Sequence, residues 1–197
     1  MRKAKIRRKT TETDIQLELN LDGRGRRRVR TDIPFMNHML ELFAMHSGFD
    51  LAVRAKGDTE VDDHHLMEDL GIVTGDALKK ALGNKKGITR YGNFLVPMDE
   101  AASFIALDIS GRPYLKYSVR FNRNFRWMKN SFDYTLLEEF FRALVSRAGI
   151  TLHVMLKYGS SNHHIAESVF KGFGRALAQA VSIRKGRKTV PSTKGRL

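Results

Sequence analysis

The spacing of hydrophobic and polar residues predicts strands and helices in a definite order along the chain. From residue 14 to residue 21 every second residue is apolar, which is typical of a half-buried strand. Residues 26–31 are expected to return beside it as a hairpin partner. Apolar residues at steps of three and four then predict a helix that Pro34 begins and Gly48 ends. A strand at 49–55 and a helix at 63–82 complete this half.

The same order is predicted a second time in the rest of the chain. Strands are expected at 94–97, 103–109 and 114–121, followed by a helix at 133–147, a strand at 150–156 and a helix at 163–183. Gly48 and Gly149 each precede a strand and follow, by ten residues, a potential ligand, His38 and Glu139. A His-His-x-x-Glu pattern then recurs at matching positions, beginning at His64 and at His163.

This register predicts a duplicated α+β protein. Each half is expected to have the order β-β-α-β-α, with the sheets packed on helices. The first half-repeat is predicted at residues 1–86 and the second at residues 87–184, together forming one compact unit. Residues 185–197 are then a basic C-terminal tail.

The two His-His-x-x-Glu patterns indicate metal binding. Residues i and i+4 share a helix face, so His64 with Glu68 and His163 with Glu167 can each chelate one ion. An α-helix has 3.6 residues per turn, so the adjacent histidine points about 100° away. It should therefore bind a different metal ion. We therefore expect two sites. The His64 site comprises His64, Glu68, Glu139 and His164, and the His163 site comprises His38, His65, His163 and Glu167.

The donor types narrow the choice of metal. Imidazole and carboxylate ligands that leave open positions on a six-coordinate ion favour Mn²⁺, with Fe²⁺, Co²⁺ and Zn²⁺ as alternatives. The chain has no cysteine, which excludes disulfides and thiolate sites and fits a reducing cytoplasm. Neither a signal peptide nor a membrane span is evident, so a cytoplasmic protein without a membrane partner is expected.

The net charge of +14 raises the alternative of a nucleic-acid-binding protein. Residues 1–30 hold eleven Lys and Arg against four acids, and residues 183–197 hold six Lys and Arg and no acid. The two ends therefore carry +7 and +6 and leave +1 for the body of the chain. This distribution argues against a continuous positive face along a duplex, and no nucleic-acid partner is expected.

Several cations stand near glycines or hydroxyl groups, as in phosphate-binding sites. They are Arg90, Arg112, Lys171 one turn beyond Glu167, and Lys194 in the segment Pro191-Ser192-Thr193-Lys194-Gly195. Of the two remaining histidines, His46 near a helix end is the better catalytic candidate, and His153 in an apolar strand is expected to be structural.

Motifs spread over most of the chain resemble those of the imidazoleglycerol-phosphate dehydratases of histidine biosynthesis. They are Arg8-Lys9-Thr10-Thr11-Glu12-Thr13, Asn37-His38-Met39-Leu40, Asp62-Asp63-His64-His65-Leu66-Met67-Glu68-Asp69-Leu70-Gly71, Pro97-Met98-Asp99-Glu100-Ala101, Ser110-Gly111-Arg112-Pro113, Asn162-His163-His164 and Pro191-Ser192-Thr193-Lys194-Gly195. The match runs from about Arg8 to about Gly195, with no attached phosphatase domain. The resemblance implies halves of the ribosomal protein S5 domain 2-like kind.

The resemblance also implies an activity. It is the dehydration of D-erythro-imidazole glycerol phosphate to imidazole acetol phosphate, with two Mn²⁺ ions per active site. A cage-like homo-oligomer of about 24 subunits, with sites at subunit interfaces, is implied as well. Two metals on the ring nitrogens would stabilise an imidazolate and let its electrons expel the hydroxyl group. A metal-dependent phosphoesterase is the alternative within enzymes.

Site residues follow from the resemblance by position. Glu12 lies close to the substrate and is the candidate acid or base, beside His46 as the second catalytic candidate. The substrate is expected to contact Glu12, His38, His46, His64, Glu68, Arg90, Arg112, His163, Glu167, Lys171, Ser192 and Lys194. One position departs from the family, since many members have His where this chain has Glu139. Either this carboxylate replaces the imidazole, or neither Glu138 nor Glu139 is a ligand.

Overall fold

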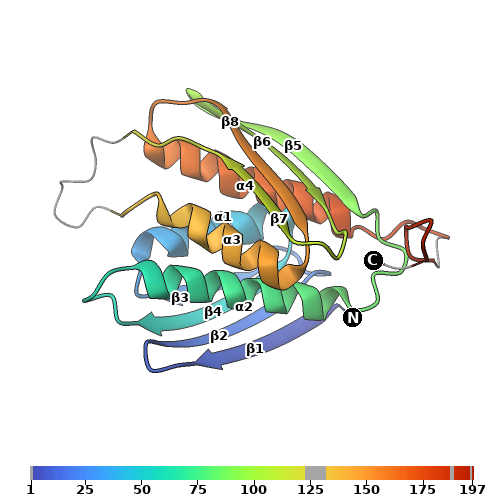
Figure 1. Ribbon diagram of the computed structural model, residues 1–197, viewed down its shortest axis with the longest axis horizontal. Coiled ribbons are helices and arrows are strands. Elements are labelled where there is room, and N and C mark those ends of the chain that lie inside the picture. The colour runs from blue at the N-terminus through green and yellow to red at the C-terminus, as the bar shows by residue number, and fades with distance from the viewer. Residues whose placement is uncertain (1, 123–131, 187–188, 196) are drawn as a thin grey trace.

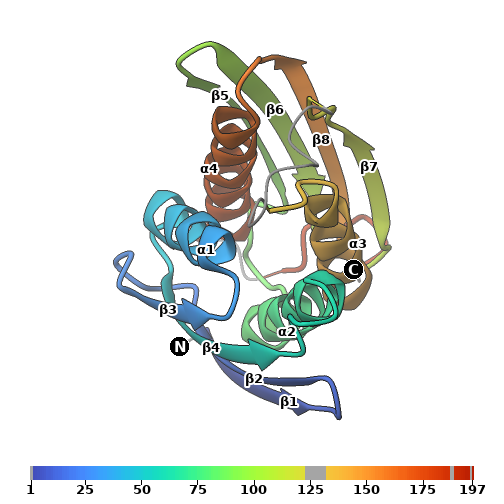
Figure 2. The same ribbon diagram turned by 90° about the vertical axis from the view of Figure 1, so that its left-hand side faces the viewer.

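In the part of the chain that the structure describes, four helices lie between two four-stranded sheets. Figures 1 and 2 show this arrangement from two sides. The computed structural model describes residues 2–122, 132–186, 189–195 and 197. The first half contains β1 (Lys3–Lys9), β2 (Thr13–Asn20), β3 (Arg27–Thr31), α1 (Pro34–Ser47), β4 (Asp50–Gly57) and α2 (His64–Leu82). The second half contains β5 (Tyr91–Met98), β6 (Ala101–Asp108), β7 (Tyr114–Ser118), α3 (Leu136–Ala148), β8 (Thr151–Tyr158) and α4 (Asn162–Val181).

The two sheets have the same topology, which confirms an α+β protein built from two similar halves. Their strand orders are β1-β2-β4-β3 and β5-β6-β8-β7. In each sheet the last strand is parallel to its neighbour, and the other pairs are antiparallel. Gly48 and Gly149 end α1 and α3 with left-handed backbones, at φ 72° and 66°. The ends of the strands and helices that were predicted lie within three residues of their predicted positions, but β1 was not predicted.

The pairing of β3 differs from the sequence prediction. Residues 27–31 do not form a hairpin with β2 but pair in parallel with β4, because α1 connects the two strands as a crossover. The hairpin partner of β2 is β1, where buried Ala4 and half-buried Ile6 alternate with cations. The repeating unit is therefore β-β-β-α-β-α. The predicted repeat β-β-α-β-α is one strand short: the sequence prediction misses β1, whereas in the second half all three strands before α3 are expected.

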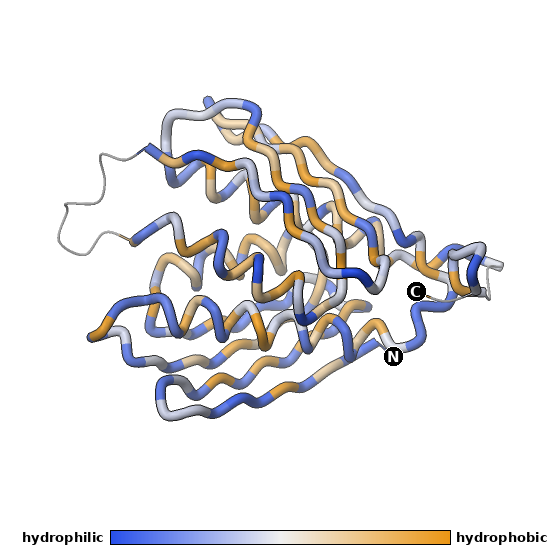
Figure 3. The backbone as a smooth tube through the Cα atoms, in the orientation of Figure 1, coloured by the Kyte–Doolittle hydropathy of each residue, from blue (hydrophilic) through white to orange (hydrophobic). Residues whose placement is uncertain are grey.

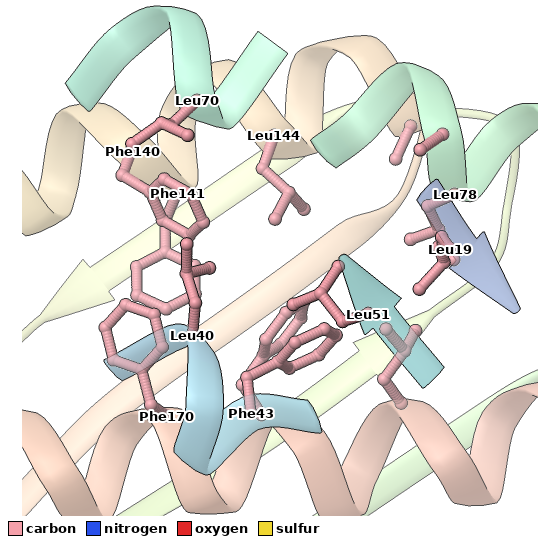
Figure 4. Close-up of a cluster of buried hydrophobic side chains, with 14 of the residues drawn as sticks. Leu19, Leu40, Phe43, Leu51, Leu70, Leu78, Phe140, Phe141, Leu144 and Phe170 are labelled. Atoms are coloured by element: carbon pink, nitrogen blue, oxygen red, sulfur yellow. The ribbon is translucent and has the colours of Figure 1, made fainter. Parts of the chain in front are cut away.

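One hydrophobic core extends across both halves. Figure 4 shows side chains of Leu40 and Leu70 from the first half beside Phe140, Phe141 and Phe170 from the second. All five are at most 1% exposed. Hydrophobic residues recur along the strands and helices in Figure 3, in keeping with the burial of one face of each element. Among the described residues, no helix combines the length and hydropathy needed to cross a membrane.

Close helix pairs join the halves at glycines. A Cβ at Gly71 of α2 would lie 2.4 Å from the carbonyl oxygen of Phe140 in α3, and one at Gly75 would lie 2.5 Å from that of Leu144. A Cβ at Gly174 of α4 would lie 2.9 Å from the carbonyl oxygen of Phe43 in α1. The residue numbers rise together from the contact of Gly71 with Phe140 to that of Gly75 with Leu144, so α2 runs parallel to α3. They also rise together from the contact of His38 with Glu167 to that of Phe43 with Gly174, so α1 runs parallel to α4.

Much of the N-terminal excess of positive charge lies on the outer face of the first sheet, where residues of β4 add to it. Its exposed cations are Lys3, Lys5, Arg7 and Lys9 on β1, Arg28 and Arg30 on β3, and Arg54 and Lys56 on β4. Fewer acids share this face, and the shortest ion pair there joins Lys5 to Glu18 at 2.6 Å. The charge is therefore gathered on a surface turned away from the helices, where water screens it.

Replacing Gly71 with alanine should destabilise the protein, because the added methyl group would overlap the backbone of Phe140. We expect a loss of about 1–3 kcal/mol, typical of overpacking. A lower midpoint of thermal unfolding, measured at equal protein concentration, checks this. Lys79→Ala changes an exposed residue of the same helix and is the control. Equal midpoints for the two variants would contradict the close contact.

Candidate active site

Two imidazoles and one carboxylate converge where α1 meets α4. The Nε2 atoms of His38 and His163 lie 2.8 and 3.1 Å from Oε1 of Glu167. The two imidazole rings stack with their centroids 5.5 Å apart. Ligand atoms of the three residues all lie within 4.8 Å of one another, which makes them a candidate metal group. These donors suit a divalent transition ion.

Local sequence places these three side chains together. Asn37 accepts a hydrogen bond from the backbone N–H of Thr31 at 2.7 Å, which fixes the first turn of α1 and with it His38. Ser161 caps α4 by accepting from the N–H of His164 at 3.4 Å, so that His163 occupies the first turn. Glu167 follows four residues later on the same face.

Glu167 is the most deeply buried member of the group, at 7% exposure. Burial raises the pKa of its carboxyl, but hydrogen bonds from Lys171 and His38 outweigh this and lower the pKa to about 2. Lys171 Nζ lies 2.6 Å from Oε2. The carboxylate is therefore ionised at neutral pH, and Lys171 balances its charge.

His65 and His164 are each oriented by a carboxylate. Asp58 lies 3.0 Å from Nδ1 of His65, and Glu100 lies 2.7 Å from Nδ1 of His164. These hydrogen bonds raise the pKa of both imidazoles. An acid on Nδ1 is the usual partner of a histidine that binds metal through Nε2. The sequence analysis did not single out Asp58 or Glu100.

The acids on Nδ1 were missed because they do not follow the repeat. Asp58 comes directly after β4, whereas Glu100 lies in the turn between β5 and β6. Glu100 also accepts the N–H of Ser161 at 2.7 Å, and its pKa falls to about 2, chiefly through His164. Only folding brings these carboxylates to the histidines.

Glu12 lies in the turn between β1 and β2, and a hydrogen-bond network holds this turn to α2. Oε1 of Glu12 is 3.9 Å from Nε2 of His65. Thr10 accepts the N–H groups of Glu12 and Thr13 at 3.1 and 2.9 Å. The hydroxyl of Thr13 donates to buried Asp69 at 2.5 Å, and Arg8 donates to the other oxygen of Asp69 at 2.8 Å.

The His64 site is less closely assembled than the His163 site. His64 lies in the first turn of α2, Glu68 is exposed, and Glu139 in α3 lies 3.5 Å from Arg142. Among the described residues, a compact ligand group forms only at His38, His163 and Glu167.

The predicted phosphate-binding residues, Lys171 excepted, gather at the other end of α4. Arg90 makes paired hydrogen bonds to Asp108 at 2.7 and 3.0 Å and donates to the carbonyl of Pro191 at 3.0 Å. The tail carrying Ser192 and Lys194 folds back here, and a Cβ on Gly111, beside Arg112, would lie 2.8 Å from the terminal Leu197. Figure 1 shows this tail far from the start of α4.

His46 stands apart from the candidate metal group. It lies in the last turn of α1, two turns beyond His38, and borders a hollow of about 520 Å³ with Phe94, Arg175 and Gln179. Burial and the positive charges of Arg175 and Lys171 lower the pKa of His46. A lowered pKa favours the neutral imidazole, which can accept a proton.

Known proteins are similar to this chain in sequence and in fold over nearly its whole length. Residues 31–177 match the family described as imidazoleglycerol-phosphate dehydratase. The enzyme of that name from Endomicrobium trichonymphae is 59% identical over 98% of this chain and 97% of its own. The one from Oceanobacillus iheyensis is 53% identical over the full length of both.

Solved structures agree. The imidazoleglycerol-phosphate dehydratase of Staphylococcus aureus superposes with a TM-score of 0.82 at 38% identity, over 92% of this chain and 99% of its own. That of Pyrococcus furiosus gives 0.83 at 36% identity, over 98% and 100%. The chain therefore belongs to the imidazoleglycerol-phosphate dehydratase family, whose members are hydro-lyases of histidine biosynthesis.

Proposed function

We propose that this enzyme dehydrates D-erythro-imidazole glycerol phosphate to imidazole acetol phosphate with two Mn²⁺ ions per active site, in the cytoplasm. The observation that carries the metal dependence is the His38, His163 and Glu167 group in a chain of this family. The His163 site adds His65 to this group. The His64 site takes His64, Glu68, Glu139 and His164. The acids on Nδ1 of His65 and His164 support both assignments.

The proton to be removed lies on carbon beside the imidazole ring and is not acidic by itself. Mn²⁺ bound at these residues supplies Lewis acidity to the ring nitrogens. Glu12 is then the acid or base, since it lies 3.9 Å from His65 in a turn that Asp69 holds to the ligand-bearing helix. His46 is a second candidate for proton transfer. The substrate loses one C–H proton and one hydroxyl, and it keeps its phosphate.

The substrate site takes residues from more than one subunit. His163 begins α4, whereas Arg90 donates its backbone N–H to the carbonyl of Ala180 at 2.8 Å. Seventeen residues of helix separate His163 from Ala180, which is about 25 Å at 1.5 Å per residue. An imidazole ring with a three-carbon chain and a phosphate is much shorter. Arg90, Arg112, Ser192 and Lys194 would therefore serve the metal group of a neighbouring copy in a large cage-like homo-oligomer, with Lys171 acting within its own chain.

Assay of the purified protein tests the activity directly. Chelator-treated protein should be inactive on imidazole glycerol phosphate, and added Mn²⁺ should restore formation of a ketone that retains phosphate. Metal analysis of the active form should find two transition ions per chain. Release of inorganic phosphate would instead indicate the phosphoesterase alternative, and full activity after chelation would contradict metal dependence.

Mixed oligomers test the sharing of the site. His163→Ala and the double variant Arg112→Ala/Lys194→Ala should each lose activity alone. Co-expression should restore part of it, because some interfaces then combine an intact metal group with an intact phosphate end. Co-expressed His163→Ala and Glu167→Ala alter the same group and should restore none. Recovery in this control pair, or none in the first pair, would contradict the shared site.

Asp69→Ala tests the positioning of Glu12. Loss of its hydrogen bonds to Thr13 and Arg8 should lower the free energy of unfolding by about 1–3 kcal/mol. It should also lower kcat more than it raises KM. The control is Ser168→Ala, the matched position of the second half, which loses a buried 2.6 Å hydrogen bond to Ser103. Equal effects of both variants on kcat would contradict this role of Asp69.

A further inference from the structure

The two proposed metal sites occupy matched positions but carry different charges. Moving 99 positions along the chain carries His64, Glu68 and Gly75 onto His163, Glu167 and Gly174. The helix pairs that bring in the remaining ligand also match. Gly174 packs against the carbonyl of Phe43 in α1, and Gly75 packs against that of Leu144 in α3. His38 in α1 therefore corresponds to Glu139 in α3, in agreement with the repeat.

The His163 site contains an internal counter-ion. Glu167 is its one carboxylate, and Lys171 holds this group at 2.6 Å while itself being only 15% exposed. The carboxylate of Glu167 and the ammonium group of Lys171 together give this site a formal charge of zero. A divalent cation that binds here must share Glu167 with an ammonium group or displace it, which costs affinity.

The His64 site has no lysine at the position that matches Lys171, and it has one more acid. Ile72 stands at the position that matches Lys171, and Glu139 stands where the other site has His38. The carboxylates of Glu68 and Glu139, counted in the same way, give this site a formal charge of −2. Arg142 lies 3.5 Å from Glu139, but it also pairs with Glu138 at 2.7 Å and is 57% exposed, so water weakens its effect on Glu139. His164 completes the His64 site and His65 completes the His163 site. Each adds one imidazole, so the difference in charge between the two sites is unchanged.

We propose that the two metal sites of this enzyme are unequal, with the His64 site binding a divalent cation more tightly and preferring harder ions than the His163 site. The inference rests on the proposed metal dependence and extends it. A second carboxylate strengthens binding of a hard cation such as Mn²⁺, whereas imidazole favours Zn²⁺ relative to Mn²⁺. Glu139 is the residue that sets this preference, and Lys171 weakens the matched site.

A titration without substrate tests the inequality. Chelator-treated full-length protein is titrated with Mn²⁺, and free Mn²⁺ is followed by its electron paramagnetic resonance signal. We expect two classes of equal stoichiometry whose Kd values differ by at least about tenfold. His64→Ala should remove the tight class, and His163→Ala should remove the weak class. A single class, or the reverse assignment, would overturn the proposal.

Matched charge variants then identify the cause. Glu139→His should weaken the tight class toward the other and raise its preference for Zn²⁺ over Mn²⁺ in competition. Glu139→Gln, which keeps an oxygen donor but removes the charge, should weaken it as well. His38→Glu should tighten the weak class instead. An unchanged tight class in both Glu139 variants would show that Glu139 does not set the affinity.

The outcomes distinguish this inference from the proposed function. If the wild-type protein binds no Mn²⁺, the metal dependence itself is wrong and the inference falls with it. If the protein binds two equivalent ions and dehydrates its substrate, the proposed function stands and only the inequality is wrong. Since affinity is read without substrate, loss of catalysis in a variant does not affect the result.

Discussion

Close parallel packing of two helix pairs is the constraint on which the candidate site depends. Where glycine removes the side chain, the backbones of α4 and α1 approach until a Cβ at Gly174 would lie 2.9 Å from the carbonyl of Phe43. That approach sets the first turn of α1 level with the first two turns of α4. His38 can then reach Glu167, although 129 positions separate them. The pairing of α2 with α3 at Gly71 repeats the arrangement in the other half.

Burial and charge act together at Glu167. A carboxylate at 7% exposure would be costly if it were unpaired, and the two imidazoles and Lys171 offset that cost. The same contacts keep its oxygens in the ionised form that a cation requires. The matched carboxylate Glu68 is exposed, and Ile72 rather than a lysine stands four residues after it. The two copies of the motif therefore have different electrostatic surroundings.

The pairing of strands in the first sheet decides where much of the positive charge lies on the surface. The sequence located the excess at residues 1–30 but did not indicate that β1, β3 and β4 would display it on one outer face. This arrangement depends on β3 pairing in parallel with β4, which places Arg28 and Arg30 beside Ala52 and Arg54. The C-terminal tail is arranged differently, since it folds against Arg90 and Gly111.

The family, the duplication, the limits of every element except β1 and the i,i+4 pairing of His163 with Glu167 could be predicted from the sequence, because motifs, periodicity and short spacing are local properties of the chain. Strand pairing and the acids on Nδ1 of the histidines were decided by the tertiary structure. Asp58 and Glu100 reach His65 and His164 from positions that the repeat does not relate, and β3 joins β4 through a crossover whose partner no local pattern specifies. Such contacts join residues far apart along the chain, and only the folded backbone brings them within hydrogen-bonding distance.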